Sequence, residues 1–268
     1  MKFIIISIIV LVLALVIALG ITILLNIIFK KKLNIYLNIL ISLSLFTVVL
    51  GLSFYAYFEN PSKAKSEARD YLVSTEDVSV SKIDSGYYFD GSGTDDVIIF
   101  YPGARVEMEA YAPMMYKLAE NGVDTIIVKM PFNFPMLGKD KANKIINEYE
   151  YKNYYISGHS LGGIMAGEYI VKTDKIAGII FMASYPTKKI NDNVKALSLY
   201  GSNDKVLSID QYNKNKKNFP SNYEEVVIEG GNHSQFGLYG KQQGDGKADI
   251  SFSEQQDIII NKIVDFVL

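Results

Sequence analysis

The first 58 residues hold two long apolar runs that a cluster of lysines separates. One run covers Phe3–Phe29 and the other Leu33–Phe58, and neither contains a charged residue. The residues between them include Lys30, Lys31 and Lys32. A helix needs about 20 apolar residues to cross the hydrocarbon core of a membrane. The pattern therefore predicts an N-terminal transmembrane hairpin over residues 1–58, with helices at about 3–29 and 33–58.

A cleaved signal peptide is the alternative interpretation of the first run. Its apolar core is longer than the roughly 7–15 residues of a signal peptide, and only Lys2 precedes it. No clear small-residue cleavage site follows it. Asn34, Asn38 and the Ser and Thr residues of the second run are expected to hydrogen-bond between the two helices. The long apolar core, the single preceding lysine and the lack of a cleavage site favour two transmembrane helices over a signal peptide.

The lysines also predict an orientation in the cell membrane. Short loops rich in Lys stay on the cytoplasmic side. The cluster between the two runs therefore places both ends of the hairpin, and the rest of the chain, on the extracellular side. Lys63, Lys65 and Arg69 follow the second run and reduce this charge bias.

The pattern after Phe58 changes to that of a folded domain. Residues 59–77 are mostly polar, hold Pro61 and predict a linker with a short helix through SKAKSEARDYLVS. From residue 78 onward, strand and helix patterns alternate. Expected strands lie at 78–83, 86–89, 96–101, 123–130, 151–157, 176–183, 196–200 and 224–229. Expected helices lie at 107–121, 139–149, 161–173 and 209–218, and a last one opens at Ser253 with Gln256 in the capping-box position. This alternation predicts an α/β domain over 78–268, a mainly parallel sheet with helices on both faces.

Composition narrows the chemistry. The chain of 268 residues has two His and no Cys, which excludes disulfides and makes an ordinary zinc site improbable. Four of its 27 Lys and Arg lie in residues 1–58, which hold no acid, so 23 basic residues face 29 acidic ones afterwards. The resulting net charge of −6 argues against nucleic acid as a partner. The composition does not predict an oligomeric state.

The stretch SGHSLGG joins a predicted strand to a predicted helix and holds Ser160. A Gly-x-Ser-x-Gly sequence at such a junction forms a tight turn that exposes the serine as a nucleophile. Gly158 and Gly162 are the small residues that let the strand and the helix approach. The alternative is an ordinary small-residue turn with an exposed serine.

The remaining catalytic candidates follow other strands. His233 in GGNHSQF is the expected base, because His159 adjoins Ser160 and its side chain must point elsewhere. Asp204 in GSNDKV is the expected acid, although an Asx turn would also explain it. Asp192 is the reserve, but it precedes a strand. The backbone N–H groups of Leu161 and Ala104 are expected to form the oxyanion hole, with Gly103 supplying backbone freedom.

Two further loops are candidates for binding. Phe132, Phe134 and Met136 follow a strand at the same edge and are expected to line an apolar acyl pocket, with Phe236 as a further member. An ordinary buried loop explains them equally well. The triplet Gly244-Asp245-Gly246 is more typical of a turn than of a calcium site.

The chain from about Asp95 to its end resembles the α/β-hydrolase superfamily, and most closely the bacterial group called alpha/beta hydrolase fold-5. The segments YPGARVEMEAYAPM, VKMPFNFPMLG, GHSLGGIMAGEYI, FMASYP, LYGSNDKV and GGNHSQFGLYGKQQGDGKADIS carry this resemblance. It implies the α/β-hydrolase fold and the Ser–acid–His chain order, here Ser160, Asp204 and His233. It does not imply a particular substrate.

Together these features predict a membrane-anchored serine hydrolase that cleaves an acyl bond, most simply a carboxylic ester, through an acyl-enzyme. The expected partner is a small-molecule acyl substrate, and the mechanism requires no metal or organic cofactor. Two alternatives stay open. One is a peptidase or thioesterase on the same triad, and the other is a membrane-anchored binding protein that keeps the fold without catalysis.

Overall fold

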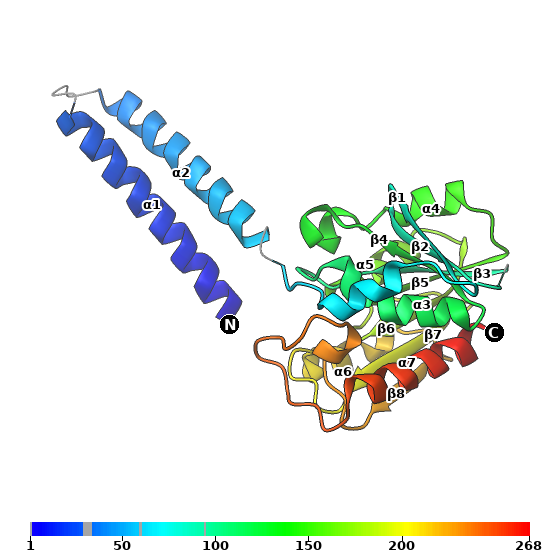
Figure 1. Ribbon diagram of the computed structural model, residues 1–268. Coiled ribbons are helices and arrows are strands. Elements are labelled where there is room, and N and C mark those ends of the chain that lie inside the picture. The colour runs from blue at the N-terminus through cyan, green and yellow to red at the C-terminus, as the bar shows by residue number, and fades with distance from the viewer. Residues whose placement is uncertain (1, 29–33, 59–60, 94) are drawn as a thin grey trace. The chain divides into compact units, whose positions relative to one another are not determined.

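The computed structural model describes residues 2–28, 34–58, 61–93 and 95–268 (Figure 1). Contacts between residues divide the chain into two compact units, Met1–Asn60 and Pro61–Leu268. The lysine cluster at residues 30–32, where we expect the turn of the hairpin, lies outside the described residues.

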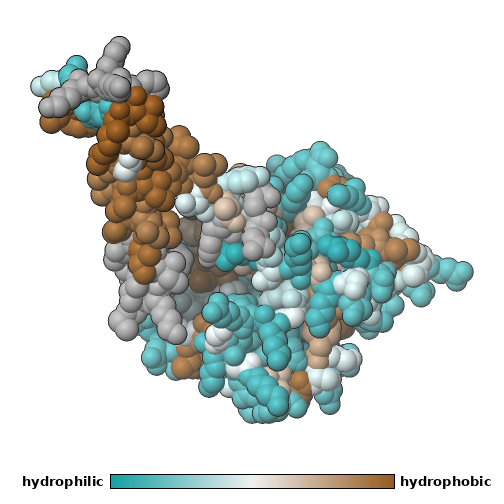
Figure 2. All heavy atoms as spheres, turned by 60° about the vertical axis from the view of Figure 1, so that its left-hand side comes forward, coloured by the Kyte–Doolittle hydropathy of each residue, from teal (hydrophilic) through white to brown (hydrophobic). Residues whose placement is uncertain are grey.

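The first unit holds two long helices, α1 (Lys2–Ile28) and α2 (Ile35–Phe58). Each contains a stretch that is long and apolar enough to cross a membrane, Ile9–Ile28 in α1 and Ile35–Ala56 in α2. Figure 2 shows hydrophobic atoms over most of this helix pair. Only 17% and 0% of the two stretches are buried, so they do not resemble the core helices of a soluble domain.

Polar side chains join the two helices. The hydroxyl groups of Thr22 and Ser42 lie 2.9 Å apart, and Asn26 Nδ2 donates to Asn38 Oδ1 at 2.7 Å. Such pairs satisfy polar groups within an apolar helix pair, as expected for Asn38. Asn34 instead caps the start of α2, because its Oδ1 accepts a backbone N–H of that helix at 2.8 Å.

The described part of the second unit is built on one eight-stranded sheet in the order β1-β2-β4-β3-β5-β6-β7-β8. The strands are β1 (Ser79–Ile83), β2 (Gly86–Asp90), β3 (Asp96–Tyr101), β4 (Asp124–Val128), β5 (Asn153–His159), β6 (Ile176–Met182), β7 (Lys195–Gly201) and β8 (Glu224–Ile228). Strand β2 is antiparallel to β1 and β4, and the other neighbouring pairs are parallel. The expected mainly parallel sheet is confirmed, and the strands from β3 to β8 all end at the same edge.

Helices cover both faces of this sheet (Figure 1). They are α3 (Ala112–Glu120), α4 (Ala142–Glu148), α5 (Leu161–Ile170), α6 (Ile209–Asn215) and α7 (Phe252–Val267), with the 3-10 turns η1 (Ser66–Leu72), η2 (Met108–Tyr111), η3 (Pro131–Asn133), η4 (Pro135–Leu137), η5 (Lys216–Asn218) and η6 (Ser234–Phe236). In β3, Ile98 and Phe100 join the apolar cluster that holds residues of α3 and α7. Val97 and Ile99 point the other way and join the cluster with residues of α4, α5 and α6. All four are fully buried, as a central parallel strand requires.

Residues 61–77, which we expect to form a linker, pack as part of the second unit. Ser62 N–H donates to Arg105 O at 2.7 Å, and Glu107 N–H donates to Ser62 O at 3.0 Å. Ala68 in η1 is fully buried. The polar composition of this segment hides these contacts, because many of them join it to distant residues such as Glu107 and Tyr116.

The last helix, α7, begins earlier than its sequence pattern indicates. Ser251 is the N-cap, since its Oγ accepts Glu254 N–H at 3.2 Å while Glu254 Oε2 accepts Ser251 N–H at 2.7 Å. Ser253, the expected first residue, lies inside the first turn. The sequence allows two capping boxes, Ser251 with Glu254 and Ser253 with Gln256. The structure forms the first, in which the partner is a charged Glu.

We predict that Ser251→Ala lowers the free energy of unfolding by about 1 kcal/mol, because the backbone N–H of Glu254 in the first turn of α7 loses its acceptor. Ser253→Ala is the matched control and should change it by less than about 0.5 kcal/mol. Urea unfolding of the detergent-solubilised chain, followed by circular dichroism, measures both. A larger loss for Ser253→Ala would contradict the observed cap.

Candidate active site

The candidate residues lie on loops at the edge where the parallel strands end. Ser160 directly follows β5, Ala104 lies after β3, Asp204 after β7 and His233 after β8. Ligands of open α/β sheets bind outside the carboxyl ends of the strands. The fold therefore gathers candidates that are far apart in sequence.

Ser160 occupies a strained turn between β5 and α5. Its φ of 53° and ψ of −123° are unusual for a residue with a side chain. Two backbone contacts fix it, because Ser160 N–H donates to Met182 O at 2.9 Å and the Ser184 hydroxyl donates to Ser160 O at 2.8 Å. The serine is partly exposed. A strained, exposed serine at a strand-to-helix turn is the geometry of a nucleophile elbow.

Close backbone contacts explain the two elbow glycines. A Cβ on Gly158 would lie 2.5 Å from the carbonyl carbon of Gly162. A Cβ on Gly162 would lie 2.2 Å from Tyr101 O and 2.4 Å from Pro102 O. Only glycine fits at both positions, so the start of α5 can lie against the loop that follows β3.

Asp204 and His233 meet although 28 residues separate them in the sequence. His233 Nδ1 lies 2.8 Å from Asp204 Oδ2, and each side chain is 1% exposed. Asp204 Oδ1 accepts the N–H groups of Val206 and Leu207 at 2.8 and 2.7 Å. The carboxylate therefore forms the Asx turn that was the alternative and also contacts the histidine. A carboxylate only accepts, so the proton of a neutral His233 lies on Nδ1.

This assignment leaves His233 Nε2 as a lone-pair nitrogen. The atom is buried and has no hydrogen-bond partner among the residues that the structure describes. The contact with Ser160 is therefore not formed as a hydrogen bond here, and such contacts often tighten only when a substrate is bound. Asp204 thus orients the His233 ring through Nδ1, and the other ring nitrogen, Nε2, stays free to accept a proton.

His159 links the elbow to the base. Its ring centroid lies 4.5 Å from that of His233, and its ring stacks on Phe236 at 5.4 Å. The hydroxyl of Tyr111 lies 2.9 Å from His159 Nδ1 and accepts Gly103 N–H at 3.1 Å. Burial, together with the neighbouring His233, holds the pKa of His159 well below its usual range. A neutral His159 thus connects the elbow with the loop of His233 and, through Tyr111, with the loop of Gly103.

The two expected oxyanion donors come from neighbouring segments. Neither Leu161 N–H nor Ala104 N–H donates a hydrogen bond to any other residue in the described part of the chain. Gly162, next to Leu161, contacts the loop that holds Ala104. The positive φ of this loop occurs at Arg105, with φ 58°, rather than at Gly103. Gly103 is needed for space instead, since a Cβ there would lie 2.9 Å from the Tyr111 hydroxyl.

The expected pocket residues separate into two groups. Phe132 and Met136 are 54% and 53% exposed, on the turns η3 and η4, and η4 packs against α5. Phe134 between them is partly buried. Phe236 is fully buried against His159, so its inclusion among the pocket residues is corrected. It supports the base loop and offers no surface to a substrate.

Some residues of this region were not found from the sequence, and one candidate lies elsewhere. Tyr111 contacts the site through its hydroxyl and Asp245 through both carboxylate oxygens, and neither belongs to a motif that predicts such a contact. Asp192, the reserve acid, is bonded to Lys189 and to Ser221 N–H instead of to His233. Among the described residues, no group of three or more His, Asp and Glu side chains is placed to hold a metal ion.

Comparisons with known proteins agree with this architecture. A profile of the Alpha/beta hydrolase family matches residues 97–257. A putative hydrolase from Agrobacterium vitis S4 has a similar structure, with a TM-score of 0.55, 13% identity, and coverage of 71% of this chain and 99% of its own. A predicted CIB-like hydrolase from Thermoplasma acidophilum gives a TM-score of 0.51, 17% identity and coverage of 70% and 98%. No curated protein matches the chain. At such identities the similar structures establish the fold alone.

We predict that His159 makes the stability of the protein depend on pH. The unfolded chain binds a proton at this residue below a pH of about 6.5, whereas the folded chain does not because the pKa of His159 is lowered. The free energy of unfolding should therefore fall below pH 6.5, by up to about 1.4 kcal/mol per pH unit from this residue. His159→Gln keeps an acceptor for Tyr111 and should remove this part.

Urea unfolding of the wild type and of His159→Gln at pH 5, 6, 7 and 8 measures the effect. His233 is present in both proteins, so its contribution cancels from their difference. The difference in free energy should be constant above pH 7.5 and should change in favour of the variant toward pH 5. A difference that stays constant over the whole range would contradict the prediction.

Proposed function

The chain belongs to the alpha/beta hydrolase family, and we propose from this premise that it is a serine hydrolase. Family and fold support a hydrolase in general. The proposed reaction is cleavage of an acyl bond, most simply a carboxylic ester, through an acyl-enzyme with Ser160, His233 and Asp204 as the catalytic triad.

One observation carries the proposal. Asp204 holds His233 at 2.8 Å through Nδ1, and the opposite nitrogen is buried without a partner in the described part of the chain. A structural histidine is expected to use both nitrogens, because a buried polar atom without a hydrogen bond costs about 1–3 kcal/mol. His159 Nε2 is also buried without a hydrogen-bond partner in the described part of the chain, so the carboxylate on Nδ1 is what marks His233 as the base. Ser160 directly follows His159, whose ring centroid lies 4.5 Å from that of His233, and it occupies the strained turn after β5.

The proposed reaction has two halves. In the first, Ser160 Oγ attacks the acyl carbonyl while His233 Nε2 takes its proton, and Asp204 stabilises the resulting imidazolium. The N–H groups of Leu161 and Ala104 hold the oxyanion, and His233 then protonates the leaving group. In the second half His233 takes a proton from water, the hydroxide attacks the acyl-enzyme, and Ser160 is released with its proton.

The apolar side chains on η3 and η4 support an apolar acyl group as the substrate. Phe132 and Met136 are exposed, and Phe134 lies between them. Since η4 packs against α5, which begins next to Ser160, these side chains lie on elements that adjoin the nucleophile. An ester of a small apolar acid fits this surface. Thioesters and peptides share the same acyl chemistry, and comparison of leaving groups on one acyl chain separates them.

We also propose that α1 and α2 anchor the hydrolase in the cell membrane with its α/β domain outside the cell. The support is the length and apolar surface of both helices, together with the lysine cluster between them. The polar pairs Thr22–Ser42 and Asn26–Asn38 suit two helices that share an apolar surrounding.

We predict that a fluorophosphonate probe labels the detergent-solubilised chain on Ser160. Ser160→Ala and His233→Gln should each lower labelling by at least about 100-fold, because nucleophile and base act as a unit. Ser157→Ala is the matched control, since its hydroxyl is buried and donates to Ile180 O at 3.1 Å. Labelling and mass spectrometry of the labelled peptide measure the effect. A folded wild type that resists the probe would favour the non-catalytic binding protein.

We predict that the α/β domain is accessible from outside intact cells. The chain has no Cys, so single cysteines report position without background. Asp84→Cys, at a side chain that is 95% exposed in the β1–β2 turn, should react with a membrane-impermeant maleimide in intact cells. Asn34→Cys, directly after the lysine cluster, should react only after lysis. The reverse pattern would show the opposite orientation.

A further inference from the structure

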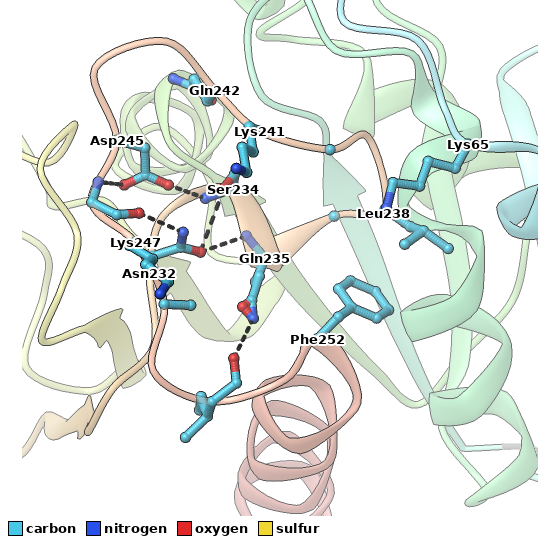
Figure 3. Close-up of a pocket in the computed structure, with 15 residues that line it drawn as sticks. Lys65, Asn232, Ser234, Gln235, Leu238, Lys241, Gln242, Asp245, Lys247 and Phe252 are labelled. Carbon is cyan, nitrogen blue, oxygen red and sulfur yellow. Dashed lines mark hydrogen bonds between the residues drawn. The ribbon is translucent and has the colours of Figure 1, made fainter.

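The segment after the base loop holds a carboxylate that the proposed mechanism does not use. Asp245 lies between Gly244 and Gly246 on the wall of a cavity of about 560 Å³, which Asn232 and Ser234 also line. These two residues flank His233. Figure 3 shows the Asp245 carboxylate directed at the backbone beside Ser234, rather than into solvent.

The carboxylate of Asp245 accepts four backbone N–H groups from three segments. Oδ2 accepts Ser234 N–H at 2.8 Å, in the base loop. Oδ1 accepts Gly246 N–H at 2.8 Å and His233 N–H at 3.3 Å. Oδ1 also lies 3.4 Å from Lys205 N–H, in the loop that holds Asp204. One side chain therefore contacts the residue after the acid and the backbone of the base.

The rest of this segment is wedged between the same two loops. Asn232 Nδ2 donates to Gly246 O at 2.8 Å, and Asn203 Nδ2 donates to Lys247 O at 3.1 Å. A Cβ on Gly246 would lie 1.9 Å from Asn203 O, so the backbone of the segment touches the acid loop. The acid loop and the base loop follow adjacent strands, but the sheet itself ends before either of them. The two loops are joined directly before Asp204 and His233, since Asn203 N–H donates to Gly231 O at 2.9 Å, and the wedge adds the contacts at Lys205, His233 and Ser234.

We infer that Asp245 is a positioning residue that clasps the acid loop to the base loop and thereby sets the Asp204–His233 contact. The inference rests on the proposed function for its catalytic meaning. A carboxylate suits this place because it only accepts hydrogen bonds, and charge-assisted bonds are about twice as strong as neutral ones. An amide would put an NH₂ group against N–H donors, and the clasp would open toward one loop.

The experiment compares Asp245→Asn with Asp249→Asn. Asp249 is the matched control, because it lies on the same segment and accepts from Asn203 Nδ2 at 2.8 Å but is not bonded to the base loop's His233 or Ser234. The first measurement is the rate of fluorophosphonate labelling of the full chain in detergent. We expect a loss of roughly 10- to 100-fold for Asp245→Asn, the cost of a small misplacement of catalytic groups. For Asp249→Asn we expect a loss of less than about 2-fold.

A double variant distinguishes positioning from general damage. If Asp245 acts through the Asp204–His233 contact, Asp245→Asn should cost less than about 2-fold in an Asp204→Asn background, since there is no contact left to align. Equal losses in both backgrounds would overturn the inference. If Asp245→Asn fails to fold, Asp245→Glu takes its place, because it keeps the charge and moves the oxygens. It should give the same pattern with a smaller loss.

A second measurement does not depend on catalysis. The chain has only two His, so histidine labelled with ¹³C gives two signals in the detergent-solubilised protein. The groups that face His233 include Asp204, Asp245 and the neutral His159. Asp204→Asn should move the His233 signal, and Asp245→Asn should move it in the same direction by weakening the Asp204–His233 contact. No shift, or a shift equal to that of Asp249→Asn, would overturn the clasp.

The two measurements separate the two proposals. If the wild type resists the probe while Asp245→Asn still moves the His233 signal, the clasp stands and the serine-hydrolase proposal fails. If the wild type is labelled and Asp245→Asn behaves like Asp249→Asn in both measurements, the clasp fails and the proposed function stands.

Discussion

The site depends on the close approach of three backbone segments that meet where β5 turns into α5. Gly158, Gly162 and Gly103 each leave no room for a Cβ, and the atoms that fill this room belong to the other segments. Ser160 adopts its strained conformation inside this contact, at a cost on the order of 1–3 kcal/mol. The cost is tolerated because the turn also lets α5 pack on the sheet. If these segments moved apart, the positions of Ser160, Ala104 and the start of α5 relative to one another would all change.

Around this contact, two buried histidines have opposite environments although their rings are 4.5 Å apart. His233 faces a carboxylate, which favours a positive charge on it during a reaction. His159 lies against a tyrosine hydroxyl and an aromatic ring with no carboxylate bonded to it, and burial together with the neighbouring His233 keeps it neutral. A second charged imidazole would repel the first, so the neutral state of His159 preserves the ability of His233 to accept a proton. The neutral His159, whose Nδ1 contacts the Tyr111 hydroxyl, therefore affects His233 electrostatically as well as by its position.

The sequence was informative wherever the chemistry is local. The elbow, the alternation of β3 to β8 and the two apolar helices follow from spacing within a few residues, and the structure contains these elements at the expected places. What failed depends on distant contacts. The start of α7 was ambiguous because two serines fit the same local rule. Three features arise from groups that are distant in sequence and that the fold brings together. They are the packing of residues 61–77, the burial of Phe236 and the contacts of Asp245, and none of them leaves a periodic pattern in the sequence.

The burial of the pair also limits how water can reach the proposed site. Asp204 and His233 are each 1% exposed, whereas Ser160 is partly exposed. In the proposed reaction, the water that deacylates the enzyme must reach the buried His233 Nε2 past the more exposed Ser160. A substrate whose leaving group departs quickly opens that approach early, whereas a bulky group that lingers keeps it closed. Under the proposed mechanism, the leaving group therefore controls when water can reach the base.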